Sequence, residues 1–413
     1  MDNLEIQRFL DSYDYDVRKS HNARWIDQKC TFDVLSFIAD CILQYIGDDI
    51  HKSFTVRDIW HSEYAVESLQ EIFTKPNPEE NSPNEYDKFF GQPLKLLGYS
   101  KVLSEQKQGR KNIYCVNNIE LLKHIAFRET NAIEFLYRYI TKVLKDSGIY
   151  EEFERFFGNQ TNGTYAITRD IFYGFTYQNT PIKGKYEPGR IFTKVINVLA
   201  YKSKKLGTAG GFLSKDIITR SDLVYNQKNW RDENSGKPKN ISRNDYKTEE
   251  LGTMAPYRIQ KAKRMLQEFN AKYRQLKSEV STNSIFENEA IHIHHIFPVA
   301  EFPVIADYLE NLIVLTPNQH LVYAHPNGHT HLISPDYQYI CLVCKAARIK
   351  ENLESQEQEH IYVFDDYMYV LNTGFSTNDF DNIRENDFIS VLIKIDEHVG
   401  SDVINNCHMQ LGI

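Results

Sequence analysis

The chain has 413 residues, a formal net charge of −8 and a hydrophobic fraction of 41%. These values exclude wholesale disorder and predict about two to four domains with sizeable cores. There is no run of about 18 apolar residues and no signal-peptide pattern at the start, so we expect no membrane partner and a cytoplasmic, bacterial-type location. Six widely spaced cysteines indicate reduced thiols and not a disulfide framework.

Residues 1–125 are predicted to form one unit, in which helices are followed by a β-hairpin. Apolar spacing and helix boundaries indicate four helices, at Thr31–Tyr45, Thr55–Trp60, Tyr64–Phe73 and Asn84–Leu97. Two strand-like runs, Lys101–Gln106 and Asn112–Val116, flank a turn in which Gly109 suits a hairpin.

This order of helices and a hairpin with a basic tip resembles a winged helix. The resemblance would place Lys88–Lys95 in a recognition helix. It would place Lys107, Arg110 and Lys111 at the tip of the wing, where they would bind DNA. Winged helices also mediate protein contacts, so a protein partner for this unit stays open as the alternative.

Residues 126–280 are predicted to form a mainly helical, basic region. Its first part, 126–180, is rich in aromatic residues and is expected to form core. Residues 183–277 then carry 22 Lys and Arg against 9 Asp and Glu, which leaves 26 basic and 47 acidic residues elsewhere. A basic block inside an acidic chain indicates a local binding surface for a polyanion. The alternative is a solvated helical surface.

Two segments of the basic block supply candidate DNA-binding residues. The segment 225–239 mixes amide, aromatic and guanidinium groups, which read base edges and bind phosphates, although it could equally be a polar loop packed on its own domain. A basic helix is predicted over Met254–Lys277. The candidates are Asn226, Lys228, Asn229, Arg231, Lys237, Lys239, Lys261, Lys263 and Arg264. Gly207–Gly211 lacks a following Gly-Lys-Ser/Thr, so no nucleotide cofactor is expected.

Residues 281–345 contain the most informative pattern of the chain. Ile291–Ile296 alternates as a strand does, and Asn311–Leu315 is expected to form a second strand. Thr316 as N-cap and Pro317 as first helical residue then predict a helix. Histidines of the strand and the helix, with the intervening asparagine, could hold one divalent metal, activate one water and fix the activating ring, as hydrolysis of a phosphodiester requires.

The pattern His-His-Ile-x-Pro at 294–298, followed by Asn-Leu-Ile-Val-Leu-Thr-Pro-Asn-Gln-His at 311–320, resembles the HNH nuclease family, whose fold is two strands and a helix around one metal. The resemblance implies that His295 is the general base and that Asn311 orients it by bridging the turn between the strands. It also implies that His294 and His320 are metal ligands. His325 is either a third ligand or a helix-end histidine that faces solvent.

The implied cofactor is one divalent metal ion. Mg²⁺, held mainly by phosphate oxygens and water, is the first expectation, and Mn²⁺ or another divalent ion is the alternative. The family often has Cys where this chain has Gln319, and it commonly has two Cys pairs that bind a structural zinc. The pair Cys341 and Cys344 is only half of such a site, so we expect buried thiols, although His329 and His331 could complete one.

The sequence therefore predicts an α+β, multidomain protein. Its parts are a winged-helix-like domain at 1–125, a helical basic region at 126–280, a ββα-metal module at 281–345, and an acidic segment at 346–413 that packs on the nuclease or at a dimer interface. The resemblance implies a sequence-specific endonuclease for double-stranded DNA, like a type II restriction enzyme in host defence. One way to cut both strands is a homodimer.

Three alternatives remain open at this point. A modification-dependent HNH nuclease would need a pocket for a flipped base, which the aromatic residues of 126–180 could supply. A non-catalytic winged-helix regulator with a vestigial HNH fold would bind DNA without metal and never cut it. An RNA-directed nuclease is the weakest option, since no RNA-binding motif is evident.

Overall fold

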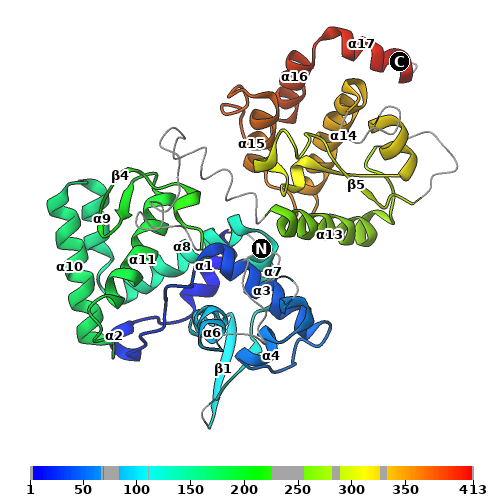
Figure 1. Ribbon diagram of the computed structural model, residues 1–413. Coiled ribbons are helices and arrows are strands. Elements are labelled where there is room, and N and C mark those ends of the chain that lie inside the picture. Colours follow the sequence, from blue (N-terminus) through cyan, green and yellow to red (C-terminus); the bar gives the residue numbers. More distant parts are fainter. Residues whose placement is uncertain are drawn as a thin grey trace, which may run out of the picture. The chain divides into compact units, whose positions relative to one another are not determined.

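The protein is α+β and mostly helical, with three two-stranded antiparallel sheets among the residues that the structure describes (Figure 1). This computed structural model describes residues 3–66, 68, 83–109, 111–225, 255–280, 289–325 and 333–411. By its internal contacts the chain divides into two units, Met1–Ser242 and Arg243–Ile413. No described helix is both long and apolar enough to cross a membrane.

The first unit begins with helices and a β-hairpin. The helices are α1 (Asn3–Asp11), α2 (Val17–Ser20), α3 (Phe32–Ile46), α4 (Val56–Trp60) and α6 (Pro83–Tyr99). Thr55 and Asp58 cap α4 reciprocally, which explains why it begins there. The expected helices at 31–45, 55–60 and 84–97 are thus confirmed, whereas most of 64–73 lies outside the described residues.

The hairpin consists of β1 (Leu103–Gln108) and β2 (Lys111–Val116), as the sequence predicts. Its register runs from Leu103 opposite Val116 to Gln108 opposite Lys111. Gly109, with φ of 61°, supplies the left-handed conformation of the turn. Figure 1 shows the hairpin projecting away from the helices of its unit, and all of β1 beyond Leu103 is exposed.

The remainder of the first unit is a helical bundle with a second hairpin. Its helices are α7 (Ile119–Phe127), α8 (Glu129–Asp146), α9 (Tyr150–Gly158), α10 (Asn162–Asn179), α11 (Glu187–Lys202) and the 3-10 helix η1 (Arg220–Asp222). Aromatic rings of 126–180 pack inside it, as expected: Phe153 and Phe172 both contact Phe192. The glycine-rich turn joins β3 (Leu206–Ala209) to β4 (Phe212–Ile217).

The second unit begins with a basic helix and a short antiparallel sheet. The helix is α13 (Ala255–Arg274), and the strands are β5 (His292–His295) and β6 (Leu312–Leu315), which are joined through the 3-10 turns η3 (Pro303–Ile305) and η4 (Leu309–Asn311). All four residues of β6 are buried. The sequence analysis grouped α13 with the central region, and in the structure it contacts β6 and η4.

The rest of the second unit is helical. A π-helix, η5 (Gln319–Ala324), is followed by α14 (Pro335–Glu354), α15 (Phe364–Phe375), α16 (Phe388–Val399) and α17 (Ser401–Leu411). Helix α14 contacts η5, α16 and α17. The acidic C-terminal segment therefore packs on the part of the chain that contains β5 and β6.

A buried ion pair joins helix α14 to the sheet through Glu279. The Lys345 ammonium, which is fully buried in α14, donates to Glu279 Oε1 at 3.2 Å and to the Tyr362 hydroxyl at 2.7 Å. The second oxygen of Glu279 accepts the backbone N–H of Val314 in β6 at 2.7 Å. Removing one partner leaves the other charge buried without compensation, which is far costlier than breaking an exposed pair.

We therefore expect Lys345→Ala to destabilise the second unit by about 3–5 kcal/mol. Lys350→Ala on the same helix is the matched control, because its pair with Glu354 is exposed, and it should cost less than about 1 kcal/mol. The three tryptophans all lie within 1–242, so tryptophan fluorescence would not report unfolding of the second unit. Hydrogen exchange by mass spectrometry in increasing urea measures the stability of that unit directly. Equal protection in both variants would contradict the role given to the pair.

Candidate metal centre

The strand β5 presents histidines on both of its faces. Side chains alternate along a strand, so His292 and His294 share one face and His295 lies on the other. The strand pairs with β6 through His292 opposite Leu315 to His295 opposite Leu312. The two predicted strands are thus confirmed, although β6 starts at Leu312 because Asn311 belongs to η4.

Gln319 anchors the helix that follows β6. It occupies the position at which the HNH family often has Cys. Thr316 and Gln319 exchange the two bonds of a capping box, with N···O distances of 2.9 and 3.3 Å. The Gln319 amide also accepts from Ser278 Oγ at 2.6 Å and donates to the Val280 carbonyl at 3.1 Å. This buried amide therefore fixes the helix start against the segment that follows α13.

Three histidines converge beside this helix. Ligand atoms of His294, His320 and His325 all lie within 4.8 Å of one another. The Nε2 atom of His294 is buried and has no hydrogen-bond partner in the described part of the chain. A buried ring nitrogen without a partner, on a histidine whose ring lies about 5 Å from two other imidazoles, fits a metal ligand. Of the two expectations for His325, this geometry favours the third ligand.

The π-helix explains how His320 and His325 reach the same point. Residues five apart on an α-helix lie on different faces, because each residue turns the helix by about 100°. The wider π turn closes its hydrogen bonds from i to i+5 and so brings such residues onto nearly the same face. The ring centroids of His320 and His325 are 4.9 Å apart.

Two rings of the cluster, those of His294 and His320, are neutral at pH 7. Burial, followed by the neighbouring His320 and His325 rings, lowers the pKa of His294 to about 3. Burial, followed by His325, lowers the pKa of His320 to about 4. Metal binding requires a neutral imidazole with a free lone pair, and these two rings keep theirs across the neutral pH range.

A fourth histidine, His292, contacts the cluster and was not assigned by the sequence analysis. Its Nδ1 lies 3.1 Å from Nδ1 of His320, so one ring donates an N–H hydrogen bond to the other. Hydrogen bonds of this kind fix the tautomer and orientation of a ligating histidine. The strand periodicity of two, which places 292 and 294 on one face, is the signal that could have identified it.

Among the residues that the structure describes, His295 is held at one ring nitrogen. Its Nε2 donates to the Ala306 carbonyl at 3.0 Å, which leaves the lone pair on Nδ1. Burial, followed by the charge of Lys263, lowers the pKa of His295 to about 4. The ring is therefore neutral at pH 7 and can accept a proton at Nδ1.

Asn311 acts on His295 through the loop and not by direct contact. Its Oδ1 accepts the Phe297 N–H at 2.8 Å, and its Nδ2 donates to the carbonyls of Phe297 at 3.1 Å and Ile305 at 3.2 Å. These bonds bridge the chain between the strands, as the resemblance implies. The bond to Ile305 fixes the backbone next to Ala306, whose carbonyl accepts the hydrogen bond from His295.

The remaining predicted DNA-binding residues are only partly described. In the first unit, Lys107 and Lys111 are exposed near the tip of the hairpin. Lys261, Lys263 and Arg264 lie on α13, where Arg264 is 3.9 Å from Glu268. The others lie outside the described residues: Arg110, Asn226, Lys228, Asn229, Arg231, Lys237 and Lys239. The same holds for His329 and His331, while Cys341 and Cys344 lie in α14.

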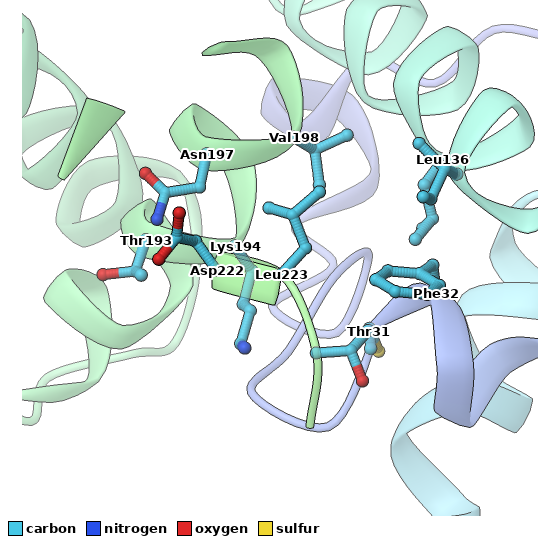
Figure 2. A pocket seen from close by; sticks show the side chains of 11 residues that line it. Thr31, Phe32, Leu136, Thr193, Lys194, Asn197, Val198, Asp222 and Leu223 are labelled. Atoms are coloured by element: carbon cyan, nitrogen blue, oxygen red, sulfur yellow. The ribbon is translucent and has the colours of Figure 1, made fainter. Parts of the chain in front are cut away.

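The first unit contains a small cavity between α3, α8 and α11. Figure 2 shows Lys194, Thr31, Phe32 and Leu136 among the side chains that line it. Its volume of about 20 Å³ has room for about one water molecule. A flipped nucleobase is much larger, so this cavity gives no support to the modification-dependent alternative.

No family model, no curated protein and no solved structure matches the chain. The chemistry of the donors is therefore the guide to the metal. Three imidazoles suit ions such as Zn²⁺, Ni²⁺ or Co²⁺, whereas Mg²⁺ prefers oxygen ligands. The cluster of His294, His320 and His325 thus fits a transition metal better than the Mg²⁺ first expected from the sequence.

We expect His294→Ala to abolish high-affinity binding of one Zn²⁺ or Co²⁺, because it removes one of the two buried ligands. His292→Ala should weaken binding by about 10–100-fold, as loss of an outer-shell partner typically does. His360→Ala is the control, since this exposed ring contacts only the Ser355 carbonyl among the described residues. Isothermal titration and the Co²⁺ absorption spectrum measure both effects, and unchanged binding by His294→Ala would show that the cluster is structural.

Proposed function

We propose that the chain is a metal-dependent DNA endonuclease of the HNH type, similar to a type II restriction enzyme, with β5, β6 and η5 as a ββα-metal module. One observation carries the proposal. The neutral ring of His295, fixed at Nε2, adjoins in sequence a buried member of a three-histidine cluster. A fixed base next to a metal centre is the combination that metal-assisted hydrolysis of phosphodiesters uses.

In this proposal His295 is the general base. Its Nδ1 takes a proton from the attacking water, while the Ala306 carbonyl prevents the ring from turning. The negative charge of a bound phosphodiester raises the pKa of the ring toward neutrality, which makes it a stronger base when substrate is present. Asn311 maintains the loop that holds this acceptor in place.

The metal would be held by His294, His320 and His325. When bound, a divalent ion stabilises charge on the scissile phosphate and on the leaving oxygen. The water oxygen forms the new bond to phosphorus, and the bond from phosphorus to the leaving sugar oxygen breaks. The leaving oxygen takes its proton from solvent.

The first unit would supply recognition of double-stranded DNA. Its exposed hairpin with Lys107 and Lys111, next in sequence to α6, supports a winged-helix-like reading domain. One metal centre per chain cuts one strand, and a homodimer on a palindromic site would cut both. Host defence in a bacterial cytoplasm follows from the likeness to restriction enzymes.

The first test is digestion of unmethylated phage DNA by the purified protein with EDTA, Zn²⁺, Mg²⁺ or Mn²⁺. We expect discrete, metal-dependent bands. His295→Ala should lower the cleavage rate by about 10²–10⁴-fold and leave DNA affinity within about twofold, because a general base contributes to the reaction and not to binding. His360→Ala should cut like the wild type.

Other results would redirect the proposal. A smear would indicate a nonspecific nuclease. Wild-type protein that binds unmethylated and methylated DNA but cuts neither would identify a binding-only regulator. Cleavage by His295→Ala at the wild-type rate would show that another group is the base.

The basic helix α13 generates a separate prediction about affinity. Lys261→Glu with Arg264→Glu should weaken DNA binding and make its salt dependence less steep, since each lost phosphate contact reduces the slope of log K against log salt by about 0.9. Fluorescence anisotropy at several NaCl concentrations measures the slope. Lys350→Glu on α14 is the control for a general change in charge, and a wild-type slope in the α13 variant would place the DNA elsewhere.

A further inference from the structure

Lys263 differs from its basic neighbours on α13. It makes no hydrogen bond and no ion pair with any residue that the structure describes, whereas Arg264 lies near Glu268. The side chain is only partly exposed, and burial lowers the pKa of its ammonium group. Partial burial of an ammonium group without a counter-charge costs free energy. A bound anion beside Lys263 would offset this cost.

The packing of α13 directs Lys263 toward β5. Ala262, Leu266 and Phe269 form the buried side of the helix. Gln267, on the flank next to that side, donates to the carbonyl of Ala290 just before β5 at 3.4 Å. Lys263 lies one turn earlier on the same flank, because residues four apart on an α-helix are neighbours.

The charge of Lys263 reaches the candidate site. It is among the groups that lower the pKa values of His294, His295 and His320. The ammonium therefore acts electrostatically on the candidate base and on two of the candidate metal ligands. A fixed cation near the candidate ligands would repel a divalent metal. A bound anion that contacts both the ammonium group and the metal would offset this repulsion.

We propose that Lys263 contacts the scissile phosphate itself, as a catalytic residue that donates to a non-bridging oxygen. This inference rests on the proposed nuclease function. It adds to the candidate site a cationic side chain from α13 that would bind the phosphate. The ammonium keeps its proton throughout: water gives its proton to His295, and Lys263 stabilises the added negative charge on the phosphoryl oxygens. Lys261 and Arg264 would then be ordinary contacts to the DNA backbone.

The test compares Lys263→Gln with Lys261→Gln in the full-length, metal-loaded protein. Single-turnover cleavage at saturating enzyme should fall by about 100-fold in Lys263→Gln, as on loss of one donor to a developing oxyanion, with DNA affinity changed less than about threefold. Lys261→Gln should mainly weaken binding, as expected of a contact to the DNA backbone, and Lys350→Gln on α14, outside the site, should leave both rate and affinity near those of the wild type. Lys263→Arg, which keeps the charge, should recover part of the rate.

Zn²⁺ titration distinguishes this role from a structural one. Removing a nearby cation should leave Zn²⁺ affinity unchanged or higher in Lys263→Gln, whereas damage to the fold would lower it together with the rate. A fall in Zn²⁺ affinity, or a normal saturated rate with weakened DNA binding as in Lys261→Gln, would overturn the proposal.

Binding of inorganic phosphate to the Zn²⁺-loaded protein gives a readout that does not require cleavage. The wild type should bind phosphate at the centre, and Lys263→Gln should bind it about tenfold more weakly. Equal phosphate affinity in the two proteins would reject the contact. If phosphate binding depends on Lys263 but no DNA is cut, the anion site stands and the nuclease function fails.

Discussion

The candidate site depends on one buried side-chain amide, that of Asn311. It is fully buried and closes the chain between β5 and β6 through bonds to Phe297 and Ile305. Leaving such a group unpaired costs about 1–3 kcal/mol, so the loop has a strong preference for one path. The ring of Phe297 lies so close to Gly374 of α15 that an added Cβ would come within 2.4 Å of it. Helix α15 of the C-terminal segment thus packs against the loop between β5 and β6 at Phe297.

At the edge of β6, buried polar groups fix the position of the elements and take no part in the proposed chemistry. Glu279 binds the N–H of Val314 in β6 with one oxygen and Lys345 of α14 with the other. Such a pair adds little net stability compared with apolar packing, but it is costly to misplace and so selects one register. On β5, the buried Nε2 of His294 has no such partner among the described residues, which fits a ligand position and not a structural one.

Sequence periodicity predicted the local elements of this site well, and the reason is physical. Strand alternation and a Thr-Pro helix start are local signals, and the structure has both near the expected position, whereas the bridging role of Asn311 came from the family resemblance. The π-helix is not local in this sense, because no residue type specifies it. The convergence of His325 with His320 therefore could not be derived from spacing alone, whereas strand alternation places His292 on the same face as His294. The direction of Lys263 depends on how α13 packs, which is tertiary information.

The electrostatics of the second unit explain how an acidic chain could act on DNA. The groups that act on His294, His295 and His320 include other imidazoles and Lys263. Adding a divalent ion to this surrounding brings positive charges together, and a phosphodiester relieves their repulsion. In the proposed nuclease, metal and DNA would therefore bind with positive coupling, since each would lower the electrostatic cost of binding the other, and linkage makes such an effect reciprocal. The metal would then bind most tightly when a phosphodiester is in place.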